Sequence, residues 1–399
     1  MIFSRISSLL HENPSLLAVE MMTYITFYLI MKHIFSSGKQ NRYVFLSVSI
    51  QMALVELLMY DSRRWHAAAT IPLLSNLPLY YVLLVAQMQY ISFVATSRLR
   101  IQISAQPFAM ACFVVLLVYP FELMGVKFLW WTLHDTDPYV QDRVYNVPIS
   151  IITNLYAFSL ANQWAFIAMR ELGLLEFRHQ ENCRREVLGV MWSVLSSLFM
   201  GFLFKVVFYG NLVLVIGIHP QVWITIVLGL SLLFVCLAVA HKDDPGVQAE
   251  LEPIGTHDAQ IFLPASKHAI NRAIYIFSLV LIVSIFTFSP SNIVSVGYHQ
   301  MLGDCSETEE YLSWLDLDFT RPKYVCVYDY DEDYTMCGTP LQELSYRKEW
   351  FAICGRDYED FGTYVVMILA IVTTWNVIFH HVMSSRNQTK LRRRSSSQK

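Results

Sequence analysis

The sequence has few charged residues. Asp, Glu, Lys and Arg make up 15% of its 399 residues, whereas hydrophobic residues make up 55%. Soluble domains carry about 25% charged residues. The low charge and a mean hydropathy of +0.40 therefore exclude a large soluble enzyme and are typical of a membrane protein that crosses the bilayer several times.

Several familiar signals are also missing. The sequence contains no H-E-x-x-H metal motif, and no internal repeat argues for a transporter built from duplicated halves. The first apolar run follows Asn13-Pro14 and lacks a small-residue cleavage site. We therefore expect this run to act both as the first membrane span and as the targeting signal.

Long hydrophobic runs recur along the whole chain. A spanning helix needs about 20 mostly apolar residues, and by this measure the sequence predicts an all-α, polytopic transmembrane helix bundle of about nine spans. The predicted spans cover residues 15–34, 43–60, 77–97, 107–129, 148–169, 187–207, 220–240, 270–290 and 362–383. The apolar stretch 208–219 is interpreted as a partly embedded connection between two spans.

Basic residues predict the orientation of these spans. Arg392-Arg393-Arg394 follow the last span, and Lys and Arg mark cytoplasmic loops. The C-terminus is therefore expected in the cytoplasm and the N-terminus outside, in the plasma membrane or the endoplasmic reticulum. One loop disagrees, because residues 61–76 are external in this scheme yet contain Arg63 and Arg64.

Cysteines predict an oxidised external segment. Four of the seven cysteines fall within residues 291–361; they are Cys305, Cys326, Cys337 and Cys354. We expect two disulfides there rather than a zinc site, because the spacings lack the close cysteine pairs of a zinc module. Four cysteines allow three connectivities, and all three stay open. The predicted organisation is a bundle at 1–290, this external segment, the last span at 362–383 and a basic cytoplasmic tail at 384–399.

Acidic and histidine residues lie where lipid should exclude them. Glu20, Glu56 and Glu122 interrupt three hydrophobic runs, and intramembrane carboxylates often mark function. His66 and the segment 134–138 (His-Asp-Thr-Asp-Pro) follow two of these runs. At 1.5 Å of rise per residue, all of these groups are expected near the outer ends of their spans.

These residues predict a polar pocket in the outer half of the bundle. Its candidate proton-transfer residues are Glu56, Glu122, His66, His134, Asp135 and Asp137. His66, His134 and Asp137 are also candidate ligands for zinc or non-haem iron, so the cofactor stays open. Plainer interpretations remain: Glu20 and Glu56 as interfacial residues, the segment 134–138 as a turn, and Trp65 and Trp130-Trp131 as part of an aromatic belt.

Part of this region resembles known families. The stretch from Trp130 to Pro138, leading into residues 145–150 (Tyr-Asn-Val-Pro-Ile-Ser), resembles uncharacterised multi-pass membrane proteins of invertebrates with a Trp-rich His-Asp-x-Asp-Pro motif. More distantly, a Trp-rich segment before G-V-P-x-S is similar to the carotenoid hydratase family, in which a glutamate-bearing helix precedes it, as Glu56 does here. The chain departs from that pattern at Asn146, where the family has glycine. The resemblance implies binding of, or water addition to, an isoprenoid-like lipid.

Three classes of function follow from these features. The first is a membrane enzyme or lipid-handling protein that uses the polar pocket. The alternatives are a receptor or channel component whose ectodomain contacts a partner, and a proton-coupled transporter that uses the glutamates. The expected partners are the lipid bilayer and a lipid-like small molecule, with no nucleic acid and with the protein partner left open.

Overall fold

The computed structural model describes most of the chain. The described residues are 2–37, 39–58, 64–74, 77–99, 101–133, 142–171, 183–207, 210, 213, 216–241, 267–304, 306–312, 318–326, 333–338 and 349–384.

Long helices occupy all the segments predicted as spans. They are α2 (Pro14–Ser36), α3 (Lys39–Leu58), α4 (Leu79–Leu99), α5 (Gln106–Lys127), α7 (Ile149–Glu171), α8 (Cys183–Phe204), α9 (Pro220–Ala240), α11 (Lys267–Thr287) and α12 (Phe361–Ser384). Within the described residues, seven helical segments are long and apolar enough to cross a membrane, which indicates a membrane protein. The more polar α3 and α7 are not among them, so nine spans are not confirmed.

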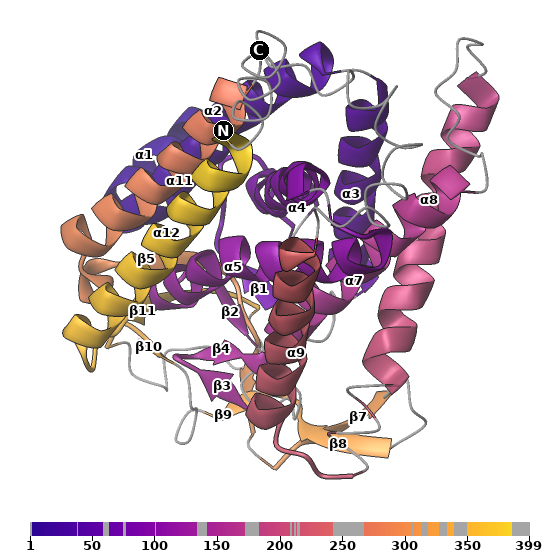
Figure 1. Ribbon diagram of the computed structural model, residues 1–399. Helices are drawn as coiled ribbons and strands as arrows, with labels where there is room; N and C mark the ends of the chain where they lie inside the picture. The colour runs from indigo at the N-terminus through magenta and orange to yellow at the C-terminus, as the bar shows by residue number, and fades with distance from the viewer. Residues whose placement is uncertain are drawn as a thin grey trace, which may run out of the picture.

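The bundle has a buried centre and an apolar rim. Among the 18 most apolar consecutive residues of each segment, 89% are buried in α4 and 83% in residues 103–127, which contain α5. The corresponding share in α9 is 22%. Around this centre, α2 packs against α11, and α7 packs against both α5 and α8 (Figure 1). The polar groups that α4 and α5 carry are therefore enclosed by protein.

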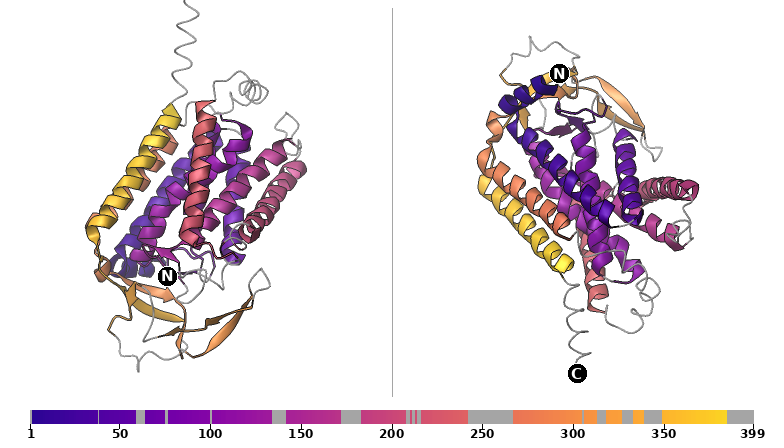
Figure 2. Two further views of the ribbon diagram at one scale, coloured as in Figure 1. Left: turned by 60° about the horizontal axis from the view of Figure 1, so that its bottom comes forward. Right: turned by 90° about the horizontal axis from the view of Figure 1, so that it is seen from above.

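Strands form a cap at one end of the bundle. They are β5 (Val294–Tyr298), β6 (Leu302–Gly303), β7 (Thr308–Leu312), β8 (Asp318–Pro322), β9 (Val325–Cys326), β10 (Tyr334–Thr335) and β11 (Trp350–Gly355). They pair as the sheet β10-β11-β5, the hairpin β7-β8 and the parallel pair β6-β9. The short helix α1 (Ile2–Glu12) lies at the same end of the bundle. Helix α12 begins at this cap end and runs to the opposite end (Figure 2).

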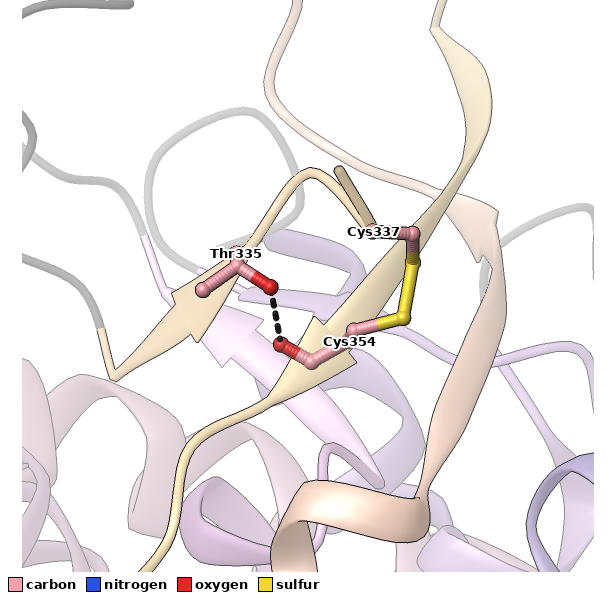
Figure 3. Close-up of a disulfide and its surroundings, with 3 residues drawn as sticks. All are labelled: Thr335, Cys337 and Cys354. Carbon is pink, nitrogen blue, oxygen red and sulfur yellow. Dashed lines mark hydrogen bonds between the residues drawn. A yellow bond between two sulfur atoms is a disulfide. The ribbon is translucent and has the colours of Figure 1, made fainter. Parts of the chain in front are cut away.

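This cap corrects the prediction of an all-α chain. Residues 294–298 alternate between half-buried and buried positions, the period of a strand, where the prediction had only a loop segment. A disulfide joins Cys337 to Cys354, next to the β10–β11 pairing (Figure 3). Cys326 is disulfide-bonded as well, and Cys305 lies outside the described residues.

A lysine at the end of α5 ties the bundle to the cap. The Lys127 ammonium donates to the Asp333 carboxylate at 2.6 Å and to the Asp357 carbonyl at 2.9 Å. It also lies 5.3 Å from the ring centre of Tyr358 and 6.0 Å from that of Tyr364. Because this ammonium is buried, these contacts fix where the cap sits on the bundle.

The connection between α3 and α4 also joins the cap. Its strand β1 (Arg64–His66) pairs with β2 (Trp131–Leu133), which follows α5. Beyond β1, the Ala68 amide donates to the Val296 carbonyl of β5 at 3.0 Å. Residues 64–70, named here the connector, therefore lie between the helix ends and the cap.

Candidate functional site

The centre of the candidate site is an ion pair between the connector and α5. One guanidinium nitrogen of Arg64, Nη2, donates to both carboxylate oxygens of Glu122, at 3.2 and 3.0 Å. The exposed fraction of the side chain is 9% for Arg64 and 1% for Glu122. Hydrogen bonds between charged groups are among the strongest in proteins, so this pair fixes the connector over the end of α5.

The carboxylate of Glu56 and the phenol of Tyr81 lie beside this ion pair. Glu56, near the end of α3, interacts electrostatically with both Arg64 and Glu122. The Tyr81 hydroxyl of α4 accepts a hydrogen bond from Arg64 Nη1 and lies 3.4 Å from Glu122 Oε1. The same hydroxyl contacts Glu56. These four residues are named here the Arg64 cluster, and they hold two carboxylates for one guanidinium.

The charges around Arg64 act in opposite directions. Burial lowers the pKa of the Arg64 guanidinium. The carboxylate of Glu122, and after it Tyr81 and Glu56, raise this pKa by more than burial lowers it, so the net pKa lies above the usual range. Burial, and after it the charge of Arg64, hold the pKa of His66 well below its usual value. At neutral pH, Arg64 is therefore charged and His66 is neutral.

Aromatic rings surround the guanidinium. Its carbon lies 4.8 Å from the ring centre of Tyr81 and 5.0 Å from that of Trp131, within the range of cation–π attraction. The His66 ring lies 4.7 Å from Tyr81 and 5.9 Å from Trp131. Gly125 allows this packing, because a Cβ there would stand 2.1 Å from the Trp131 ring.

Two polar ring atoms near the cluster lack partners. Within the described part of the chain, neither Nδ1 of His66 nor Nε1 of Trp131 has a hydrogen-bond partner, and both are buried. Trp131 Nε1 lies near the Glu122 carboxyl without meeting hydrogen-bond geometry. Buried polar atoms are normally paired, so these two are available to a bound molecule.

Glu20 lies in a neighbouring cluster rather than beside Arg64. Its Oε1 accepts from the Thr70 amide of the connector at 2.9 Å, and its buried Oε2 has no partner among the described residues. Tyr24 and Tyr80 interact electrostatically with Glu20, and Tyr80 also interacts with Arg64. The connector therefore contacts Glu122 and Glu20 and interacts electrostatically with Glu56.

Polar side chains continue from this site through the bundle. Buried amides lie along α3, α4 and α7; they are Gln51, Gln87, Gln89, Asn162 and Gln163. Asn162 donates to Gln89 at 3.2 Å in the middle of the bundle, and Gln163 donates to Gln106 at the end opposite the cap, at 3.3 Å. The side-chain carbonyls of Gln51, Gln87, Asn162 and Gln163 have no partner among the described residues.

The predicted site residues are only partly brought together. Glu56, Glu122 and His66 meet around Arg64, whereas His134, Asp135 and Asp137 lie outside the described residues. Within the described part of the chain, no group of three metal-ligating side chains occurs. The predicted roles of all six residues therefore stay predictions.

Arg64 was not predicted as a site residue. In the sequence it stands out only because it contradicts the expected orientation of its loop. The structure gives the reason: Arg64 is buried against Glu122 rather than exposed to lipid headgroups. An arginine near two intramembrane glutamates was the signal available, because buried charges need partners.

Comparison with known families places the chain in a family of unassigned function. A family model described as "Domain of unknown function (DUF7802)" matches residues 3–384. The chain belongs to this family. The matched residues include the Arg64 cluster and the cap. No curated protein and no solved structure matches, and the resemblance to carotenoid hydratases stays a prediction from motifs alone.

Proposed function

We propose that this chain is a proton-coupled membrane transporter, with Glu56, Arg64 and Glu122 as its proton site. One observation carries the proposal: two carboxylates, those of the buried Glu122 and the half-buried Glu56, share one guanidinium. An unpaired buried charge is costly, so such a group tends to be neutralised. The cluster is electrically neutral when one carboxyl holds a proton, and it gains or loses charge with that proton.

The buried amides support transport over a role confined to one face. Polar atoms facing the interior of a membrane bundle are expensive and often mark ion or substrate pathways. Here they extend from the Arg64 cluster to Gln163 and Gln106 at the opposite end. Carbonyl groups without a partner along this row suit transient contacts with water or solute.

The arrangement of the helices supports nine crossings. α2 begins at the cap end, where the Asn13 side chain donates to the Phe128 carbonyl. α3 returns to that end, because the connector after it pairs with β5. We therefore propose that α3 and α7 cross as well, with the cap and the N-terminus outside the cytoplasm, in the plasma membrane or the endoplasmic reticulum.

The membrane enzyme and the receptor remain second candidates. The enzyme depends on His134, Asp135 and Asp137, and its metal prediction is tested by elemental analysis of the purified protein beside a His134→Ala, Asp137→Ala variant. A metal lost in the variant would favour the enzyme. Because Glu56, Arg64 and Glu122 lie together within the described residues, whereas the three residues that the enzyme depends on lie outside them, transport is the better-supported function.

Infrared spectroscopy tests the proton site without knowledge of the solute. The wild type at neutral pH should show a carboxylic acid band that weakens in Glu56→Gln or Glu122→Gln. Glu309→Gln, from the Arg321–Glu309 pair of the cap, serves as the matched control and should leave the band unchanged. An unchanged band in both cluster variants would overturn the proton site.

Reconstituted liposomes test the coupling. With an inward proton gradient, we expect uptake of at least one of phenylacetate, lactate, glutamate, choline, glucose or uridine, and loss of its gradient dependence in Glu122→Gln. Wild-type protein that is folded by circular dichroism yet moves neither protons nor any of these solutes would contradict transport.

A further inference from the structure

The guanidinium of Arg64 is held as a binding site for an anion. Its Nη2 contacts both oxygens of the Glu122 carboxylate, and its Nη1 contacts the Tyr81 hydroxyl. A planar guanidinium can recognise a carboxylate with two of its nitrogens, but Glu122 takes up only Nη2. Glu122 therefore fills the place that the carboxylate of another molecule would take.

Unused groups surround that place. Trp131 Nε1 is a hydrogen-bond donor near the Glu122 carboxyl and, like His66 Nδ1, has no partner among the described residues. Both side chains are more than nine-tenths buried. An incoming carboxylate could accept from Trp131 while it pairs with Arg64, which Glu122 in its present position does not do.

The surrounding rings favour an apolar or aromatic body on that ligand. Tyr81 and Trp131 lie 5.3 Å apart between ring centres at 71°, and His66 contacts both. These rings are buried, and the guanidinium lies over the faces of Tyr81 and Trp131. A carboxylate on Arg64 would therefore have aromatic carbon beside it, which suits an apolar or aromatic body.

We propose that the Arg64 cluster binds a carboxylate with an apolar body, which replaces Glu122 on Arg64 when Glu122 takes up a proton. The proposal rests on the proposed function, because it names the solute class of the same proton site. One proton and one carboxylate enter together, so the charge of the cluster is unchanged. Binding and release therefore carry one proton for each carboxylate.

Two sources of such a carboxylate are compared directly. Phenylacetate represents water-soluble aromatic acids and decanoate represents fatty acids, with benzyl alcohol and decanol as their neutral counterparts. Binding is measured by calorimetry and thermal stabilisation on full-length protein in lipid nanodiscs. We expect one acid or both to bind, and the alcohols to bind more weakly by about tenfold to a hundredfold, the value of a hydrogen bond to a charged group.

The variants separate this site from general binding. The double variant Glu56→Gln, Glu122→Gln should bind the acid more tightly than the wild type and lose most of the pH dependence, because Arg64 then has no carboxylate to release. Arg64→Lys keeps the charge but loses the planar geometry, and Arg64→Gln loses both, so affinity should fall in that order. Arg321→Gln, from the cap ion pair, should match the wild type.

The outcomes distinguish the two proposals. Gradient-driven uptake of another solute, with no acid binding to the wild type or to the double variant, would overturn the carboxylate inference and leave proton coupling intact. Acid binding that Arg64→Lys does not change would also overturn the inference, because the acid would then bind at another place in the protein. Acid binding at Arg64 without any gradient-driven transport would keep the ligand class and refute the transporter.

Discussion

At the scale of single residues, Arg64 should control stability more than either glutamate of its cluster. Arg64→Gln leaves Glu56 and Glu122 without their cation, and breaking a buried ion pair by removing one partner costs about 3–5 kcal/mol. Glu56→Gln should cost less, because Glu122 still pairs with Arg64. Thermal and denaturant unfolding of the purified protein measure both values.

A matched pair in the cap provides the control for Arg64. Arg321 pairs with Glu309 at 2.7 Å, but Glu309 is 34% exposed, so Arg321→Gln should cost about 0–1 kcal/mol. The double variant Arg64→Gln, Glu122→Gln should be more stable than Arg64→Gln, because it removes an unpaired carboxylate. Equal losses for Arg64→Gln and Arg321→Gln would mean that the buried pair has no special role.

His299 makes stability depend on pH. Burial lowers its pKa to about 4, although a backbone hydrogen bond with Ser295 opposes the shift. Thr132 lies 3.2 Å from its Nδ1 and Phe351 packs on its ring. Because the folded pKa lies below the unfolded value of about 6.5, stability is complete above pH 6.5 and falls as the pH drops toward 4, by about 3 kcal/mol in all.

His299→Gln is the variant that tests this dependence. The melting temperature of the wild type should fall between pH 6.5 and pH 4, and the decline should be shallower in His299→Gln because the glutamine side chain does not titrate. His66 also has a lowered pKa, so His66→Gln is measured alongside. Parallel curves for the wild type and His299→Gln would contradict the assignment to His299.

At the scale of elements, the contact between the connector and β5 requires a glycine. A Cβ on Gly297 would stand 3.1 Å from the His66 carbonyl and 3.2 Å from the Cα of Ala67. Gly297→Val should push the connector away and cost about 1–3 kcal/mol, as overpacking does. It should also weaken ligand binding and proton uptake, because Arg64 and Thr70 belong to the connector.

A glycine elsewhere in the chain separates this effect from glycine loss as such. Gly229 lies within α9 with open space around its Cβ position, so Gly229→Val serves as the control. Comparison of unfolding and of the infrared carboxyl band in the two variants decides the point. A normal band in a destabilised Gly297→Val would show that the connector does not position the cluster.

The sequence predicts the elements of this fold better than their contacts. Apolar runs of spanning length predict the long helices, because each run can be recognised within one continuous stretch of sequence. The strands of the cap are two to six residues long, so their alternation is weak. The pairing of Arg64 with Glu122 joins residues 58 apart and depends on how the connector folds, which no local pattern records.

The three glutamates could be predicted as site candidates because each interrupts an apolar run. The way they group in space could not be predicted. Depth along the helix predicts that Glu20, Glu56 and Glu122 lie at one end of the bundle. Depth does not predict the direction in which each side chain points around its helix. For that reason Glu20 meets Thr70 instead of Arg64, although all three glutamates contact or approach the connector.

At the scale of the whole molecule, the cap and the ends of α3 and α5 form one continuous layer. β1 pairs with β2, and the connector beyond β1 pairs with β5. Hydrogen bonds cannot join segments on opposite sides of a bilayer, so residues 64–70, residues 131–133 and the cap must lie on one side. Seven crossings without α3 would place the connector on the other side from the cap.

Glycosylation mapping tests this topology. Ser306→Asn creates an Asn-Glu-Thr acceptor on an exposed position of the cap, and it should be glycosylated in a cell that makes secretory proteins. The natural acceptor Asn387-Gln388-Thr389 follows the last span and should stay unmodified, because we expect it in the cytoplasm. A mass shift that disappears on endoglycosidase treatment, in Ser306→Asn but not in the wild type, is the expected result. Modification of the wild type at Asn387 would reverse the orientation and would place the disulfide-bonded cap in the cytoplasm, where thiols are kept reduced.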